Sequence, residues 1–92
     1  MENNFINLDC TFRDGGYHNN WNFKKPLIEK YLKCMSKLKI NFIELGFRFL
    51  NRNKSRGETA YTEEKFINQL RIPKNLNIGV MINAGDFLSH VD

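Results

Sequence analysis

A short segment near the N-terminus, Arg13-Asp14-Gly15-Gly16, combines groups that could carry out chemistry. A carboxylate such as that of Asp14 can bind a hard divalent cation when it lies at the end of a strand. The neighbouring guanidinium of Arg13 can bind a substrate carboxylate through two hydrogen bonds and stabilise a developing enolate. Because the two side chains are adjacent, we expect them not to pair face to face and each to serve another partner.

Gly15 and Gly16 would let the backbone turn sharply and approach a ligand closely. Asp-Gly by itself indicates only a turn, so that simpler interpretation stays open. The segment follows a predicted strand with polar side chains on one face. This context favours a functional interpretation, because the catalytic groups of a βα barrel follow the ends of its strands.

Glu44 is a second candidate, since it lies inside the otherwise apolar segment 42–47. A buried glutamate is energetically costly unless it is paired, and Arg13 or Arg48 could be its partner. The pair could be a structural ion pair, or the glutamate could orient a catalytic arginine or a metal-bound water. The sequence leaves both interpretations open.

Other side chains of the first loop are weaker candidates. Tyr17 and His18 follow the two glycines, and a lone histidine is usually an ordinary loop residue, with a catalytic role as the alternative. We expect Trp21 and Phe23 to fold this loop back onto the rest of the protein rather than to stack on a ligand. His90, near the C-terminus, has no evident partner and is assigned no role.

The elements that must position these residues alternate along the chain. We expect strands over residues 5–10, 42–47 and 76–82, and a polar loop over residues 11–25. A helix should begin at Pro26, which fits a first helical turn. Apolar residues at helical spacing follow that proline: Leu27, Ile28, Tyr31, Leu32, Met35 and Leu38.

The ends of the helices carry their own signals. Asn41 could close the first helix in a left-handed conformation. A long polar loop should span residues 51–61, after which Thr62 provides a capping hydroxyl for a second helix. That helix should reach about Leu70, and Pro73 marks its stop. Residues 84–86 should begin another loop or helix.

The order β-α-β-α-β favours parallel strands joined by right-handed helical crossovers. Each predicted strand has one apolar face and one face with polar or small residues, such as Asp9, Glu44 and Asn77. An antiparallel sheet with one wet face would give the same pattern, but the helical crossovers argue against it. We therefore predict an α/β barrel whose apolar faces pack against outer helices, with the polar faces directed inward toward a site at the C-terminal strand ends.

The composition is that of an ordinary globular protein, with 41% hydrophobic and 26% charged residues among 92. No apolar run approaches the roughly 20 residues of a membrane span, and the first residues do not read as a secretory signal. Cys10 and Cys34 lack metal-type spacing, so we expect reduced, buried thiols and a cytoplasmic protein.

The net charge of +4 requires nucleic-acid binding to be considered. Basic residues cluster over 24–39, where a helix should present them to solvent, and over 48–56, in a loop. Arg48, Arg52 and Arg56 could attract an anionic substrate, or could simply be solvated. Because no nucleic-acid motif is present, we regard such a partner as unlikely. A small basic α/β binding module without catalysis, or a non-catalytic relict that scaffolds a partner, is the alternative to an enzyme.

Four segments of the sequence resemble a known family. Residues 8–17, with Arg13-Asp14-Gly15-Gly16, and residues 19–23 resemble the opening of the DRE-TIM metallolyases, which include hydroxymethylglutaryl-CoA lyases and 4-hydroxy-2-oxovalerate aldolase. Residues 42–48 and 79–86 also match. The resemblance implies the N-terminal β-α-β-α-β portion of a parallel (β/α) TIM barrel, with all 92 residues forming one incomplete domain.

The resemblance also implies roles for the candidate residues. Asp14 would bind the divalent metal, Mn²⁺ or Mg²⁺, and Arg13 would stabilise the enolate while Glu44 supports that arginine. The reaction would cleave or form a carbon–carbon bond beside the carbonyl of a 2-oxo acid or related substrate. The residues that would contact the substrate are Tyr17, His18 and Arg48.

Two departures from the family pattern stand out. In the pyruvate-forming members a histidine base lies three positions after the metal aspartate, where this sequence has Tyr17, with His18 one place later. The His-x-His pair that completes the metal site is absent, and a whole barrel takes roughly 250 residues. We therefore expect the chain alone to be inactive. Its open sheet should associate with the remainder of the barrel or with itself.

Overall fold

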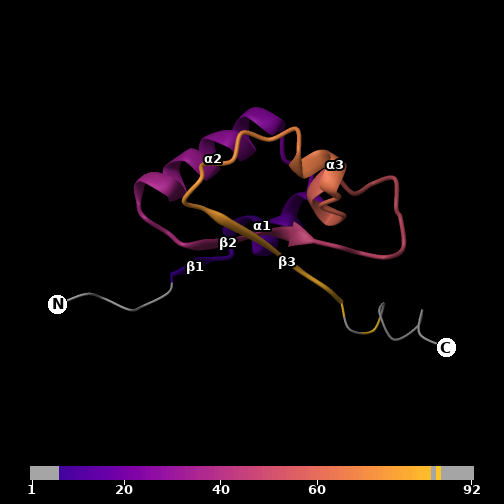
Figure 1. Cartoon of the computed structure of the whole chain (residues 1–92). Coiled ribbons are helices and arrows are strands. Elements are labelled where there is room, and N and C mark those ends of the chain that lie inside the picture. The colour runs from indigo at the N-terminus through magenta and orange to yellow at the C-terminus, as the bar shows by residue number, and fades with distance from the viewer. Residues whose placement is uncertain (1–6, 84, 86–92) are drawn as a thin grey trace.

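The computed structural model describes residues 7–83 and 85. Its sheet contains the parallel strands β1 (Leu8–Asp9), β2 (Phe42–Phe47) and β3 (Asn77–Met81), in that order. The expected start of the first strand at Phe5, and the expected element at 84–86 apart from Gly85, lie outside the described residues. The structure thus confirms an α/β arrangement with parallel strands, as Figure 1 shows.

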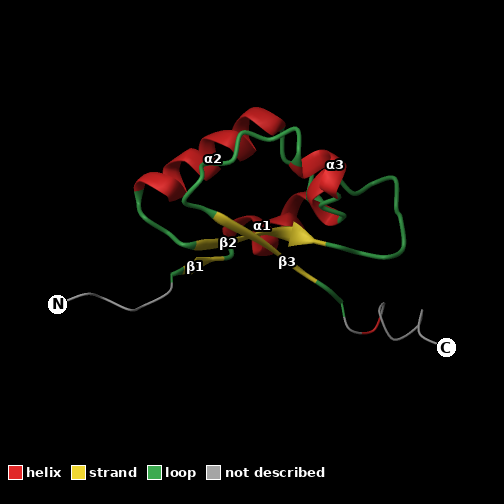
Figure 2. Ribbon diagram, in the orientation of Figure 1, coloured by secondary structure: helices red, strands yellow, loops and turns green. Residues whose placement is uncertain are grey.

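The helices are α1 (Thr11–Asn19), α2 (Lys25–Lys37) and α3 (Glu64–Ile67), with a short 3-10 helix, η1 (Glu58–Ala60). Helices α2 and α3 lie on the same side of the sheet, whereas α1 lies beside the strands themselves (Figure 2). Among the described residues no helix is long and apolar enough to cross a membrane.

The predicted helix at Pro26 is confirmed as α2, and the proline lies in its first turn. Ile28 and Leu32 are completely buried, as are Ile43 and Leu45 of β2. Each buried leucine or isoleucine contributes roughly 1.5–3 kcal/mol relative to an exposed one. This core therefore fixes α2 against one face of the sheet, and it also includes Phe12, Phe66, Leu70 and Leu76.

The loop predicted over residues 11–25 is wrong for its first half, because residues 11–19 form helix α1. The helix begins after Cys10, whose carbonyl accepts the Asp14 N–H at 3.0 Å. No proline interrupts the segment. The two glycines do not turn the chain, since no glycine in the described part has a positive φ. Instead the helix ends at Asn20 and Trp21, whose φ angles are 56° and 59°.

Gly16 has a packing role rather than a conformational one. A Cβ atom at this position would lie 1.9 Å from the Trp21 ring. Trp21 is only 4% exposed and packs with Phe47, Ala60 and Tyr61 in a second cluster. The expectation that Trp21 folds the N-terminal segment back onto the rest of the protein is therefore confirmed, and Phe23 packs against both clusters.

The predicted faces of the first strand are reversed. Leu8 pairs with Phe42, and Asp9 pairs with Ile43. Paired residues of neighbouring strands point to the same face of a sheet, so Asp9 lies on the side covered by α2. Leu8 lies on the opposite face and is 55% exposed. The register of pairing, which the sequence of one strand does not contain, decides this orientation.

The predicted cap at Asn41 is also wrong. Lys39 takes the left-handed conformation instead, with a φ of 59°. Asn41 connects the strand starts, since its side-chain oxygen accepts the N–H of Asn7 and its carbonyl accepts the N–H of Asn77. Its polar groups therefore set the register at one end of the sheet.

Thr62 does not cap the second helix as predicted. It is fully buried, and its hydroxyl lies 2.9 Å from the Phe47 carbonyl and 3.0 Å from that of Thr59. Helix α3 begins at Glu64 and ends at Ile67, so it is shorter than predicted. The hydroxyl joins the end of β2 to η1, and the residue that precedes α3 is Glu63, which makes no side-chain capping hydrogen bond.

Both cysteines were predicted to be buried, and this prediction is wrong for each of them. Cys10 is half-buried and Cys34 is exposed, and both are free thiols. Cys34 lies on α2 away from the core residues of that helix, so nothing in the packing requires it to be covered.

Candidate active site

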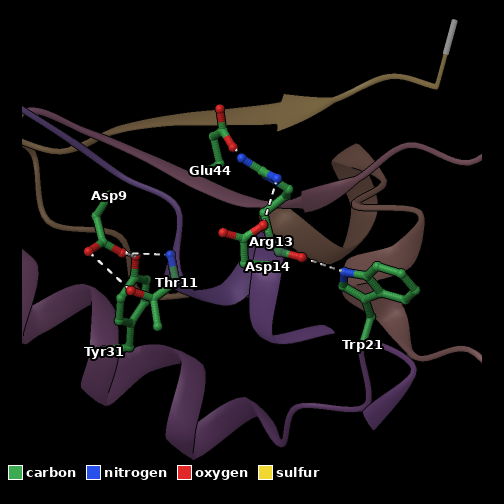
Figure 3. Close-up of polar contacts among 7 residues, drawn as sticks. All are labelled: Asp9, Thr11, Arg13, Asp14, Trp21, Tyr31 and Glu44. Carbon is green, nitrogen blue, oxygen red and sulfur yellow. Dashed lines mark hydrogen bonds and ion pairs between the residues drawn. The ribbon is translucent and has the colours of Figure 1, made fainter. Parts of the chain in front are cut away.

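Arg13 and Glu44 form an ion pair across two elements, helix α1 and strand β2. Arg13 Nε donates to Glu44 Oε2 at 2.7 Å. The side chains are only 22% and 15% exposed. The prediction that Glu44 has an arginine partner is confirmed, and the partner is Arg13 rather than Arg48. Figure 3 shows the guanidinium reaching up toward the carboxylate.

Arg13 also pairs with its neighbour, against expectation. Its Nη1 lies 2.7 Å from Asp14 Oδ1, so the guanidinium joins two carboxylates (Figure 3). The guanidinium can reach both carboxylates because its Nε and Nη1 donate in different directions. The hydrogen bond to Glu44 is the main cause that raises the pKa of Arg13, and burial acts in the opposite direction. The guanidinium is thus fixed in position and permanently charged.

Cys10 lies beside this pair and was missed by the sequence analysis. Burial raises the pKa of its thiol, and a hydrogen bond to Glu44 raises it further despite the opposing effect of Arg13. The thiol is therefore neutral at pH 7 and is not a prepared nucleophile. Side chains alternate between the two faces of a strand, so Cys10 shares a face with Leu8. Once Leu8 is known to lie on the same face as Glu44, this alternation places Cys10 on that face too.

Asp9 belongs to a separate network on the side of α2. One carboxylate oxygen accepts the Tyr31 hydroxyl and the Thr11 N–H, and the other accepts the Thr11 hydroxyl at 3.1 Å. Burial raises the pKa of Asp9, but these hydrogen bonds outweigh it, so the pKa is lowered from the usual 3.8. Burial, and then the bond to Asp9, raise the pKa of Tyr31. Figure 3 shows the network of Asp9, Thr11 and Tyr31 apart from the Arg13–Glu44 pair.

The lowered pKa of Asp9 predicts a loss of stability in acid. A depressed folded-state pKa contributes stability that is present above the unfolded pKa and is lost as pH falls through the folded value. In Asp9→Asn, the deficit in unfolding free energy relative to wild type should be largest at neutral pH and should shrink below about pH 3.8. Urea unfolding measured from pH 7 to pH 2 tests this.

Tyr31→Phe provides the matched control, because it removes one of the bonds that lower the pKa of Asp9. Its acid-dependent loss of stability should be smaller than that of wild type and should be complete at a higher pH, since the folded-state pKa of Asp9 rises toward its ordinary value. Parallel curves for wild type and Asp9→Asn over the whole range would contradict the prediction.

The other predicted substrate residues have different environments. Tyr17 is 63% exposed, and its ring packs edge-on against Trp21 at 4.9 Å. His18 is exposed in the last turn of α1. Arg48 pairs with Glu64 at 2.8 Å, which engages its guanidinium at the start of α3.

A divalent cation needs more ligands than the described part of the chain offers in one place. Among residues 7–83 and 85, no group of three His, Cys, Asp or Glu side chains is arranged to hold a metal ion. Asp14 is 66% exposed, and its Oδ1 is engaged by Arg13. The described residues therefore provide fewer than three such ligands in any one place, and a complete site would need ligands from elsewhere.

The basic residues have two different environments. The lysines of α2 and its flanks are exposed, as predicted; they are Lys24, Lys25, Lys30, Lys33, Lys37 and Lys39. The loop arginines are held more firmly, because Arg52 pairs with Glu63 and lies over the Tyr61 ring. Nucleic-acid binding, which the sequence makes an unlikely property, is not tested by these observations.

Comparison with known proteins gives one structural likeness. The sequence matches no protein-family profile and no curated protein. Among solved structures the chain is similar to one described as the "N-terminal domain of a putative aldolase from Bacteroides vulgatus", with a TM-score of 0.69 and 34% identity. The match covers 80% of this chain and 25% of that one.

The chain therefore spans about a quarter of the length of the protein that it matches. At this identity the likeness extends to sequence as well as to fold. The chain is thus similar to part of an aldolase-related protein, in agreement with its small α/β fold of parallel strands and helices.

Proposed function

We propose that this chain is the N-terminal portion of a divalent-metal-dependent aldolase or lyase of the DRE-TIM type, built as a (β/α) barrel. The observation that carries the proposal is the Arg13–Glu44 ion pair. It lies just beyond the C-terminal end of β1, where barrel enzymes place their catalytic groups. The similarity to a structure described as the "N-terminal domain of a putative aldolase" supports the same reaction class.

The uncovered face of the sheet supports a barrel. Leu8 and Phe42, which pair across β1 and β2, are 55% and 38% exposed. In the described part of the chain, β1 and β3 each have one neighbouring strand. A barrel would close both edges with further strands and would bury this face as its interior. The same exposed face would otherwise favour self-association.

Arg13 can stabilise negative charge during the proposed reaction. Its Nε and Nη1 are used by Glu44 and Asp14, which leaves Nη2 as the nitrogen that engages neither carboxylate. A fixed guanidinium nitrogen can donate to the oxygen on which charge develops as a carbon–carbon bond beside the carbonyl of a 2-oxo acid breaks. Glu44 acts as a positioning residue, because its carboxylate holds the guanidinium.

Asp14 is the residue that would bind the metal, Mn²⁺ or Mg²⁺. Its exposed carboxylate keeps Oδ2 accessible, and oxygen is the ligand that hard cations prefer. When bound, the cation would polarise the substrate carbonyl as a Lewis acid. The remaining ligands would come from later strands of the barrel.

The metal assignment predicts that Asp14→Asn weakens Mn²⁺ binding by at least about tenfold, a loss of roughly 1.4 kcal/mol. The reason is the loss of an anionic ligand. The measurement is a calorimetric titration of the protein with its complete barrel.

Glu64→Gln is the matched control. It removes a carboxylate that is also exposed and arginine-paired, but at the start of α3, and the variant should bind Mn²⁺ as wild type does. Equal affinity in wild type and Asp14→Asn would remove Asp14 from the metal site. Carbon–carbon cleavage assayed on a panel of 2-oxo acids, with and without Mn²⁺, then tests the reaction itself.

A further inference from the structure

A groove lies on the surface beside the long loop that follows β2, away from the Arg13–Glu44 pair. One wall contains residues 22–24 and the other contains residues 52–54 and 56–58, and the volume is about 750 Å³. This is within the range of roughly 300–1,000 Å³ found for small-molecule sites. Neither Arg13 nor Glu44 lines it.

The two walls are joined by hydrogen bonds, so the groove is preformed. The Gly57 N–H donates to the Asn20 carbonyl at 2.8 Å, and the Thr59 hydroxyl donates to the Trp21 carbonyl at 3.1 Å. The Asn22 side chain donates to the Ser55 carbonyl at 3.0 Å. A preformed site loses little conformational entropy when a ligand binds.

The lining of the groove is strongly cationic. It contains Lys24, Arg52, Lys54 and Arg56 against one carboxylate, Glu58, which leaves an excess of three positive charges within the lining. Glu63, which is outside this lining, neutralises Arg52, so an excess of two charges remains. Such an excess in a concave site attracts a multiply charged anion more than a single carboxylate.

Arg56 is the central cation of this arrangement. Its guanidinium lies 4.2 Å from the centre of the Phe49 ring and 5.9 Å from that of Trp21. Stacking on aromatic rings holds the group without neutralising it. Among the described residues no carboxylate forms an ion pair with it. Its planar set of donors remains available to an anion, and phosphate oxygens match that geometry.

We propose that this groove binds a phosphate-bearing small molecule. The guanidinium of Arg56 binds the phosphate, and Lys24 and Lys54 add charge around it. The rings of Phe23 and Tyr61, which also line the groove, provide apolar contact for the organic part of the ligand. The proposal is independent of the aldolase assignment, because it uses different residues.

The test uses the fluorescence of Trp21, the single tryptophan of the chain, because Arg56 lies over its ring. The 92-residue chain is titrated with inorganic phosphate and with pyrophosphate at about 0.15 M salt, which is the physiological ionic strength. Binding is expected to be saturable and tighter for pyrophosphate. Arg56→Gln should weaken it by about tenfold or more, the effect of losing a charge-assisted hydrogen bond.

Lys33→Gln is the matched control, because it removes the same charge from the outer surface of α2, outside this groove. It should leave the affinity unchanged. Lys54→Gln is a second test variant on an exposed side chain, and it should weaken binding without disturbing the stacked rings. Thermal unfolding checks that each variant is folded.

Three outcomes would overturn the proposal. The first is the absence of saturable binding of either anion at millimolar concentration. The second is equal affinity in wild type, Arg56→Gln and Lys54→Gln. The third is an equal loss in Lys33→Gln, which would indicate diffuse charge attraction. None of these outcomes bears on Mn²⁺ binding at Asp14, so the two proposals fail separately.

Discussion

Gly16→Ala is expected to destabilise the protein strongly, although alanine is the better helix former. The new Cβ would lie 1.9 Å from the ring of Trp21, far inside van der Waals contact. Helix α1 cannot shift easily, because Phe12 one turn earlier is part of the main core. The ring would have to leave a position where it is 4% exposed. Loss of a buried aromatic side chain costs about 3–5 kcal/mol, and urea unfolding measures it.

Gly15→Ala is the matched control one residue earlier in the same helix. Its new Cβ would meet only Phe23 Cζ at 3.6 Å, an ordinary contact. This variant should gain about 0.5–1 kcal/mol, because alanine restricts the unfolded chain and favours the helix. The two substitutions should therefore have opposite signs. Equal effects at the two positions, or an unchanged Trp21 fluorescence in Gly16→Ala, would contradict the arrangement of α1 against Trp21.

Under the proposed function, Arg13→Gln is expected to lower kcat for carbon–carbon cleavage by about 10²–10³-fold, the usual effect of removing one donor that stabilises a developing oxyanion. The loss should fall mainly on kcat rather than on KM, because the charge develops in the transition state. Steady-state kinetics of the proposed complete barrel, on whichever 2-oxo acid of the panel is cleaved fastest, provide the measurement.

Two further variants separate catalysis from stability. Arg71→Gln removes an exposed arginine far from the ion pair in sequence, and it should leave kcat unchanged. Glu44→Gln keeps a side-chain oxygen for Arg13 Nε but removes the charge, so it should lower kcat less than Arg13→Gln does. If Arg13→Gln retained wild-type kcat while folded, the arginine would have a structural role alone.

The sequence predicted well where a local pattern is strong. The apolar residues of α2 recur at helical spacing, and Ile28 and Leu32 are indeed buried in the core. The bounds of β2 agree with the prediction at both ends. The partnership of Glu44 with an arginine also followed from the cost of leaving a half-buried carboxylate unpaired.

Local patterns failed at α1, where two glycines and polar residues indicated a loop. Glycine costs a helix about 1 kcal/mol relative to alanine. Here the packing of Trp21 directly onto Gly16 offsets that cost, and a residue with any larger side chain would prevent the contact. The residue types around the glycines do not indicate that the Trp21 ring will pack on Gly16.

By itself, then, the sequence determined the alternation of strands and helices and the chemical types of the candidate groups, because periodicity and burial costs act over a few residues. Only the tertiary structure decided that Arg13 rather than Arg48 meets Glu44, and that Asp9 faces Tyr31 on the other side of the sheet. These outcomes depend on strand register and on the position of α1, which arise from contacts between segments that are distant in the sequence.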